Sequence, residues 1–333
     1  HERTTMSRTL KDLLATGAYD APALGAPGRP PLDYRGLRAV IADTLTTLNA
    51  LDIGRGDRVA IVLNNGPEMA ACYMACASGV TSAPLNPAYR ADEFEFYLQD
   101  LNAKALIVEA GSASPAVAVA QKLGVRLIDL VAPTDGPAGA YSLVARDGAT
   151  ASAAAENGGF AHPDDVSMVL HTSGTTSRPK IVPLSQANLV ASATHIGRTL
   201  RFTPGDRGLN IMPLFHIHGL IAGILAPLSA GSFVFCTPGF NALKFFAWMD
   251  EAQPTWYTAV PTMHQAILSR AGKNADVIAR HPLRFIRSSS SSMPPQVIAE
   301  LEQVFGAPLI ESYGMTEATH QMASNPLPPA VRK

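Results

Sequence analysis

Short apolar runs alternate with helical patterns along most of the chain, and this alternation limits the possible fold more than any other feature. Apolar residues recur at helical spacing over residues 37–51, the turn IGRGDR follows, and VAIVL (59–63) is then continuously apolar. Continuous apolar runs are typical of strands that are buried on both faces. Strands of this kind, joined by helices, predict an α/β fold with a mostly parallel sheet covered on both sides.

The same alternation resumes beyond residue 162. Strand patterns lie at 165–172, 208–214, 231–236, 255–260, 285–292 and 308–314. Helical patterns lie between them at 187–200, 240–253 and 294–306. Residues 132–162, by contrast, are rich in Ala, Gly, Ser, Thr and Asp and show little periodicity, so they are expected to form a surface connection.

The composition excludes several classes of protein. A chain of 333 residues is too long for one small core, so it requires a large α/β body or two packed ones. With 47% hydrophobic residues, 16% charged residues and a formal net charge of -1, the chain is neither disordered nor a basic nucleic-acid binder. The most apolar segment, 219–235, is interrupted by Pro227 and is shorter than the ~20 residues of a membrane span.

The cysteines point to a reducing compartment. Cys72, Cys76 and Cys236 form no metal-binding pattern. A small, odd number of cysteines in a chain of this size is typical of proteins that form no disulfides. No signal peptide is recognised, so a cytoplasmic protein is expected.

The segment HTSGTTSRPK (171–180) holds four hydroxyl side chains, one glycine and two cations directly after an apolar run. It lies where a strand ends and the next helix has not begun, which is where open α/β sheets bind ligands. Hydroxyls and the N–H groups beside a glycine can surround a polyphosphate, and Lys180 adds a positive charge. Pro179 stands where a Walker loop needs glycine, so that loop is excluded. Alone, the segment would also fit a polar linker.

Two further motifs follow the loop in order, PLFHIHG (213–219) and ESYGMTE (311–317). With these motifs the chain, from about Asp33 to Pro329, resembles the adenylate-forming superfamily of acyl-CoA synthetases, luciferases and adenylation domains. The resemblance is greatest to the oxalate–CoA ligases, through HTSGTTSRPK, TWYTAVPTMHQAIL, RFIRSSSSSMPP and MTEATHQMASNPLPP. It implies two packed, mostly parallel β-sheets covered by helices over residues 11–329, connected near 132–162.

The resemblance also implies how the ends of the chain are organised. Residues 1–10 would be a disordered N-terminus that begins with vector-derived residues, and residues 330–333 would be a tail. The smaller C-terminal domain of the family would be absent, together with its lysine and a ribose-binding acidic residue. The chain alone is therefore expected to be a very slow or inactive ligase.

For the nucleotide, the resemblance implies two sets of contacts. The phosphate loop would comprise Thr172, Ser173, Gly174, Thr175, Thr176 and Lys180. The remaining nucleotide contacts would come from Ser289, Ser290, Ser291, Glu311, Ser312, Tyr313, Gly314, Met315 and Thr316. Within this set Tyr313 would stack on the adenine, Thr316 would bond the α-phosphate, and the adjacent Glu317 would coordinate Mg²⁺. An aromatic face suits a purine and a carboxylate suits a hard cation.

The phosphate loop departs from the family at two positions where glycine is usual. Ser177 is shared with the oxalate-like subgroup, whereas Ile181 is unusual. A β-branched side chain restricts the backbone, so Ile181 is expected to slow any movement of the loop.

Four residues are candidates for binding the acid: His216, His218, Ser290 and His320. The resemblance places His216 in the acyl pocket, while His218 is two residues further on, where an extended chain would face the other way. His320 follows Glu317 by three positions, so a helical turn would place it beside the metal ligand. A single histidine is more often structural, but a group of donors suits the second carboxylate of a very small acid.

The implied reaction is attack of a substrate carboxylate on the α-phosphorus of ATP, which expels pyrophosphate, followed by transfer of the acyl group from acyl-AMP to CoA. Lys180, Thr316, Glu317 and His216 are the catalytic candidates, because two anions approach only where cations and donors surround them. The predicted protein is an ATP- and Mg²⁺-dependent acid–CoA ligase for oxalate or another small dicarboxylate. The alternatives are an aromatic or medium-chain acyl-CoA synthetase, and a nucleotide-binding module without turnover.

Overall fold

The computed structural model describes residues 8–148, 153–172 and 178–332, which divide into two compact units. Of this part of the chain, the residues up to Ala15, Arg35–Asn64 and Glu68–Ala191 form unit 1, whereas Thr16–Tyr34, Asn65–Pro67 and the residues from Ser192 onward form unit 2. Each unit has its own sheet and its own hydrophobic core. Every helix so described is too short or too polar to cross a lipid bilayer.

Unit 1 is built on a seven-stranded sheet in the order β7-β6-β5-β3-β4-β8-β9. Its strands are β3 (Arg58–Val62), β4 (Thr81–Pro84), β5 (Ala105–Glu109), β6 (Arg126–Val131), β7 (Ser142–Ala145), β8 (Val166–Thr172) and β9 (Lys180–Ser185). The strands are parallel from β6 to β8 and antiparallel at both edges. The continuously apolar run is β3, in which Val59 to Val62 are all buried.

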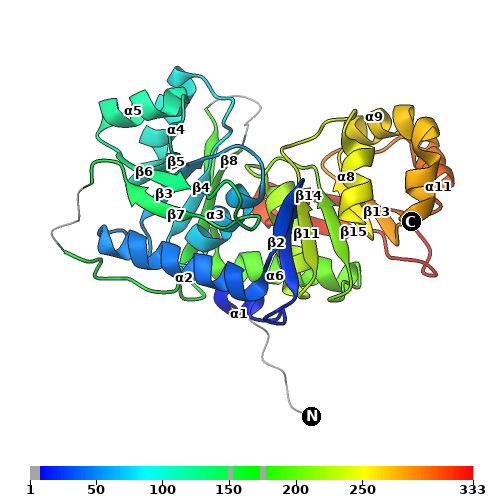
Figure 1. Cartoon of the computed structure of the whole chain (residues 1–333), viewed down its shortest axis with the longest axis horizontal. Coiled ribbons are helices and arrows are strands. Elements are labelled where there is room, and N and C mark those ends of the chain that lie inside the picture. Colours follow the sequence, from blue (N-terminus) through cyan, green and yellow to red (C-terminus); the bar gives the residue numbers. More distant parts are fainter. Residues whose placement is uncertain (1–7, 149–152, 173–177, 333) are drawn as a thin grey trace, which may run out of the picture. The chain divides into compact units, whose positions relative to one another are not determined.

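Helices cover both faces of this sheet. The helices of unit 1 are α1 (Leu10–Leu14), α2 (Tyr34–Ala50), α3 (Pro67–Ala77), α4 (Ala91–Leu101), α5 (Pro115–Leu123) and the first residues of α6 (Gln186–Thr199), which continues into unit 2. Phe94 of α4 and Val119 of α5 share one core cluster with Val62 and Val108 of the sheet. Figure 1 shows α4 and α5 on one side of the strands and α2 on the other.

Unit 2 is built on an eight-stranded sheet in the order β15-β14-β13-β12-β10-β11-β1-β2. Its strands are β1 (Pro22–Ala26), β2 (Arg29–Asp33), β10 (Arg207–Asn210), β11 (Phe233–Cys236), β12 (Trp256–Ala259), β13 (Phe285–Ser288), β14 (Leu309–Met315) and β15 (His320–Ser324). Its helical segments are the π-helix η1 (His218–Leu225), α7 (Ala226–Ser229), α8 (Phe245–Ala252), α9 (Pro261–Ala271), η2 (Gly272–Asn274), α10 (Ala275–Arg280), α11 (Pro295–Phe305) and η3 (Thr316–Ala318). The strands from β1 to β14 in this order are parallel, and only the outermost pairs are antiparallel.

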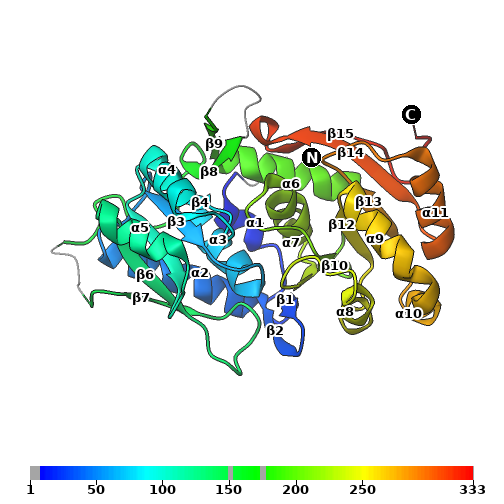
Figure 2. The same cartoon turned by 90° about the horizontal axis from the view of Figure 1, so that it is seen from above.

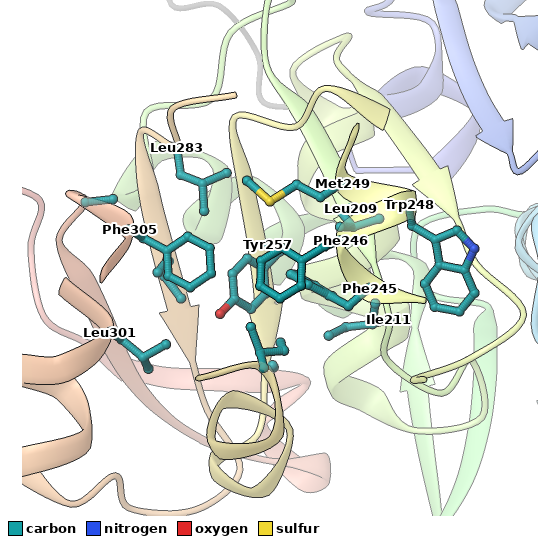
Figure 3. Packing of buried hydrophobic residues seen from close by; sticks show 14 of the residues in the cluster. Leu209, Ile211, Phe245, Phe246, Trp248, Met249, Tyr257, Leu283, Leu301 and Phe305 are labelled. Carbon is teal, nitrogen blue, oxygen red and sulfur yellow. The ribbon is translucent and has the colours of Figure 1, made fainter. Parts of the chain in front are cut away.

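Alternate residues of β12 and β13 face opposite sides of the sheet. On one side, Tyr257 and Ile286 join a core formed with α8, α9 and α11, in which Phe246 and Phe305 stack with their ring centroids 6.4 Å apart (Figure 3). Figure 2 shows these helices beside β12 and β13. Burial of each such side chain contributes about 1.5–3 kcal/mol, so the core holds the strand ends in place.

On the opposite side, Thr258 of β12 and Arg287 of β13 are register partners. The π-helix η1 covers this side, since its first residue, His218, contacts both of them. Gly219 is required there, because a Cβ at this position would collide with the carbonyl oxygen of Pro213.

The prediction of an α/β fold with two mostly parallel sheets covered by helices is confirmed. The expected connection at 132–162 differs from the structure, because its described residues belong to unit 1 and contain β7. The last passage of the chain from unit 1 to unit 2 lies between Ala191 and Ser192, inside α6. Periodicity did not predict β7, since Leu143 is its one buried residue.

Candidate nucleotide and acid site in unit 2

A cleft of about 770 Å³ opens at the carboxyl end of β13. Its walls come from residues 290–292 after β13, 311–314 of β14, 323–326 of β15 and the segment that follows, and Val331. The parallel pairing of β13 with β14 extends to Ser288 and Glu311, so the cleft begins where that pairing ends. This is the edge at which α/β sheets bind ligands.

The side chain of Tyr313 is presented at this cleft and is 62% exposed. Beside it, Ser289 is buried and donates from Oγ to the carbonyl of Ser312 over 3.2 Å, which ties the loop after β13 to β14. An exposed ring on a fixed strand can stack on a flat heterocycle. The predicted nucleotide residues that line this cleft are Ser290, Ser291, Glu311, Ser312, Tyr313 and Gly314.

The chain leaves the strand after Met315. Met315 ends β14 and is exposed, and Thr316 begins the turn η3. Glu317 lies exposed within that turn. In the described ranges no three His, Cys, Asp or Glu side chains form a metal-binding group. A single exposed carboxylate fits Mg²⁺, which shares its coordination with phosphate oxygens and water rather than being enclosed by protein.

Next to Ser290 lies a group of polar side chains that we call the polar pocket: Ser290, His218, Thr258, Arg287, His320 and Gln321. His218 is 2% exposed, and its two ring nitrogens lie 3.0 Å from Ser290 Oγ and 2.7 Å from Thr258 Oγ1. Its ring stacks on that of His320, with centroids 4.9 Å apart and planes inclined by 19°.

Arg287 is fully buried at the centre of the polar pocket. Its N–H groups donate to His218 Nε2 at 3.2 Å, His320 Nε2 at 3.0 Å, Thr258 Oγ1 at 3.3 Å and Gln321 Oε1 at 3.1 Å. Because a guanidinium only donates, both Nε2 atoms accept, which places the proton of each ring on Nδ1. His218 Nδ1 therefore donates to Ser290 Oγ.

The surroundings lower the pKa values of Arg287, His218 and His320. Burial lowers the pKa of Arg287 to about 9. Burial, and then the nearby charge of Arg287, hold the pKa of His218 and of His320 well below the usual value of histidine. Both imidazoles are consequently neutral at pH 7, and the pocket has one positive charge.

Of the four predicted acid-binding residues, the structure brings three together: His218, Ser290 and His320. His216 is exposed and packs on Phe215, with ring centroids 4.5 Å apart. His218 was expected to face the other way on an extended chain, but the strand ends at Asn210 and a π-helix begins at His218. The helical geometry turns this second histidine inward.

Three residues of the polar pocket were not predicted from the sequence: Arg287, Thr258 and Gln321. The signal for Arg287 was present, because the expected strand FIRS contains a cation although its neighbours are apolar. A charge within a buried strand requires polar partners. Thr258 follows from Arg287 once the pairing of β12 with β13 is known.

The predicted phosphate loop lies in unit 1, between β8 and β9. Thr172 and Lys180 are register partners at the ends of these antiparallel strands, and Lys180 is exposed. Ser173, Gly174, Thr175, Thr176 and Ser177 lie outside the described residues. Ile181, the unusual residue of the loop motif, packs against the core cluster of unit 1, which gives its apolar side chain a structural role.

Comparison with known proteins agrees with this architecture. The model of the AMP-binding enzyme family matches residues 15–333, so the chain belongs to the family of AMP-binding enzymes. The oxalate–CoA ligase of Arabidopsis thaliana is 41% identical over 330 residues, which are 97% of this chain and 63% of that protein. The oxalate–CoA ligase of Saccharomyces cerevisiae is 38% identical over 298 residues, 84% of this chain and 54% of that protein.

A solved structure shows the same fold. The chain is similar to ATP-bound MatB from Rhodopseudomonas palustris, with a TM-score of 0.80 and 27% identity, over 98% of this chain and 63% of that one. The chain thus spans less than two thirds of the length of these three proteins. The membership in the adenylate-forming enzymes that the three motifs predicted is confirmed.

Proposed function

We propose that the chain takes part in the ATP-dependent activation of a small carboxylic acid, first to acyl-AMP and then to acyl-CoA, with oxalate or another small dicarboxylate as the preferred acid. The observation that carries this proposal is the position of Ser290, which lines the 770 Å³ cleft and also bonds to buried His218. The cleft and the cluster of mostly buried polar side chains behind it therefore share the side chain of Ser290. Such a shared wall favours reaction between a nucleotide phosphate and a carboxylate.

In this proposal ATP occupies the cleft, with its adenine on Tyr313 and alongside the backbone of Ser289–Ser291. Thr316 donates to the α-phosphate. Glu317 holds Mg²⁺, which when bound neutralises charge on the phosphates. The similar MatB structure is ATP-bound, which supports ATP as a ligand of a protein with this fold.

The outer phosphates are assigned to Lys180 and the loop residues 172–176 of unit 1. Lys180 begins β9, where its ammonium group is exposed at the end of the hairpin. An ammonium is a strong partner for a phosphate, because the hydrogen bond between them joins opposite charges.

The acid is assigned to the polar pocket and its entrance. Ser290 and His320 would hold its second carboxylate, and the exposed His216 would border the entrance beside Phe215. Polar walls of this kind disfavour a fatty chain, since its methylene groups would bury donors without partners. The oxalate–CoA ligases among the relatives support an acid of this size.

In the reaction, one carboxylate oxygen of the acid attacks the α-phosphorus, the bond to the pyrophosphate oxygen breaks, and acyl-AMP remains. The sulfur of CoA then attacks the acyl carbon, the thiol proton is lost, and AMP departs. The residues of this chain would supply donors and charge where the two anions meet, which is usually the largest contribution to such a rate.

The partners in this proposal are the acid, ATP and CoA, without nucleic acid, in keeping with the net charge of -1. The compartment is proposed to be the cytoplasm. Cys72, Cys76 and Cys236 are buried free thiols, which supports a reducing environment.

The proposal is tested by pyrophosphate release with oxalate, malonate and coumarate, each with ATP and Mg²⁺, beside calorimetric titration with ATP. Release that depends on a small dicarboxylate is expected, at a very low rate for the chain alone. Release with coumarate alone would favour an aromatic acyl-CoA synthetase. Binding of ATP without release for any acid would favour a nucleotide-binding module, and the absence of ATP binding would contradict both.

A further inference from the structure

The guanidinium of Arg287, on strand β13, is fully buried. Among the described residues no carboxylate pairs with it, and its Nε has no hydrogen-bond partner. All of its partners are neutral, namely two histidine nitrogens, a hydroxyl and an amide oxygen. A buried charge is costly unless an opposite charge accompanies it.

Three other arginines of unit 2 have a carboxylate partner. Arg284 pairs with Asp206 at 2.9 Å, Arg280 with Asp250 at 3.0 Å, and Arg332 with Glu302 at 2.9 Å. These three side chains lie at the surface or half-buried, where charge is least costly. The fully buried Arg287 differs from them in both respects, so its neutral surroundings favour an anion that arrives from outside the chain.

Three residues in or beside the polar pocket have an unusual backbone conformation. Ser290, Thr319 and His320 have φ angles of +76°, +57° and +85°, in the left-handed region that residues other than glycine seldom adopt. The turn that carries His320 is fixed by Ser192, whose Oγ donates to the carbonyl of Thr319 over 2.5 Å. Strain of this kind persists where surrounding contacts over-determine the geometry, and it concentrates at binding sites.

Arg287 donates hydrogen bonds in two directions, and of the two end points only Ser290 lines the cleft, since His320 is buried. One chain of bonds runs through His218 to Ser290, whose hydroxyl lines the cleft. The other ends at His320, whose Nδ1 has the proton. A donor that bonds one nitrogen of an imidazole makes the N–H at the other nitrogen a stronger donor, so the charge of Arg287 strengthens the donors of Ser290 and His320.

We propose that Arg287 determines the charge class of the acid. Acting through His218 and His320, its buried charge selects a small acid with two negative charges over a singly charged acid of the same shape. This inference rests on the proposed function. It adds the residue that makes the site selective for an acid with a second carboxylate. Arg287 is a positioning residue, because it is separated from the cleft by the side chains it supports.

The test compares oxalate with oxamate, in which an amide replaces one carboxylate at nearly constant shape. Dissociation constants for both are measured by calorimetric titration of the chain in the presence of saturating AMP. The unaltered chain is expected to bind oxalate at least about tenfold more tightly, a difference of about 1.4 kcal/mol. Equal affinities for oxalate and oxamate would overturn the proposal without any variant.

Three variants complete the experiment. Arg287→Gln removes the charge and keeps a donor, so its ratio of affinities should fall to about one, because both acids then meet a neutral pocket. Arg287→Lys keeps the charge but loses the planar fork, so it should bind both acids more weakly and still prefer oxalate. Arg280→Gln, which removes the same charge from the surface, should keep the original ratio.

Circular dichroism and the affinity for AMP establish that each variant is folded. If Arg287→Gln does not fold, the ratios of oxalate to oxamate affinity in the unaltered chain and in Arg287→Lys test the proposal. A folded Arg287→Gln that retains the original ratio would contradict the role of Arg287. Failure of the unaltered chain to bind AMP would instead contradict the proposed function, so the two failures are distinguishable.

Discussion

Lys180 stands at the first position of β9, paired with Thr172 across the hairpin, and its side chain extends into solvent. Its proposed contacts are to the outer phosphates alone. Lys180→Ala should therefore weaken the binding of ATP about tenfold, or about 1.4 kcal/mol, and change the binding of AMP little. Calorimetric titration with both nucleotides measures this difference.

The matched control is Lys122→Ala, which removes an exposed lysine from α5 of the same unit. It should leave both affinities unchanged. Equal weakening of ATP and AMP by Lys180→Ala would exclude Lys180 from the outer phosphates.

Glu317 is the one protein carboxylate assigned to Mg²⁺. Glu317→Gln removes its charge at nearly constant shape, so the dependence of ATP affinity on the concentration of Mg²⁺ should become much weaker while the fold is retained. Titrations with ATP at several concentrations of Mg²⁺ measure the effect, with the exposed Glu300→Gln of α11 as the control. Coincident curves for Glu317→Gln and the unaltered chain would show that the ion is held elsewhere.

At the scale of elements, the pairing of β14 with β15 places His320 in the polar pocket. Gly314 allows this close approach, because a Cβ on it would collide with the carbonyl of His320. Gly314→Ala should displace the turn and lower the free energy of unfolding by about 1–3 kcal/mol, as overpacking does. Urea denaturation measures that change, and oxalate affinity should fall in the same variant.

Gly272→Ala provides the comparison for that substitution. It adds the same methyl group at η2, where nothing lies within 4 Å of the new Cβ. Its stability should be unchanged or slightly increased. If Gly314→Ala and Gly272→Ala had the same free energy of unfolding, β14 and β15 would be able to move apart without loss of stability.

At the scale of the whole molecule, buried neutral histidines predict how stability depends on pH. His264 is fully buried against the hydroxyl of Tyr257, and burial lowers its pKa from 6.5 to about 4. The unfolded chain therefore binds the proton more readily, so stability is complete above pH 6.5 and is lost as the pH falls toward 4. The full loss from this residue is about 3 kcal/mol.

Urea denaturation at a series of pH values between 7.5 and 4 measures this loss. His264→Gln should flatten the decline, because the variant has no imidazole to protonate at that position. His195→Gln, at an exposed position on α6, should retain the original slope. A slope for His264→Gln equal to that of the unaltered chain would contradict the assignment to His264.

Most of the fold follows from the sequence, because buried parallel strands require continuous apolar runs and such runs are visible without any structure. The strand that contains Val59–Val62 and the aromatic face of α8 are examples. The interior of the site is harder to predict from the sequence. His218 points inward because a π-helix begins there instead of an extended chain, and its position depends on the contact with Thr258 of β12.

Arg287 shows the same limit more sharply. Its position within FIRS is local information, but its partners come from β12, η1 and β15, which are distant in the sequence. Only the register of neighbouring strands shows that these side chains meet. The motifs therefore predicted residues that the structure places around the cleft, whereas the buried cation became evident only from the tertiary structure.

Ser290 belongs to both the cleft and the polar pocket, and under the proposed function this dual membership would make the two ligands heterotropic effectors of each other. A nucleotide that orders the Ser290 loop would also orient the hydroxyl to which His218 donates, and an acid bound at that hydroxyl would order the same loop. Coupling free energies are reciprocal, so the factor by which AMP tightens oxalate must equal the factor by which oxalate tightens AMP. An enzyme built in this way would retain each reactant best when the other is present, and abortive release of either one would be suppressed.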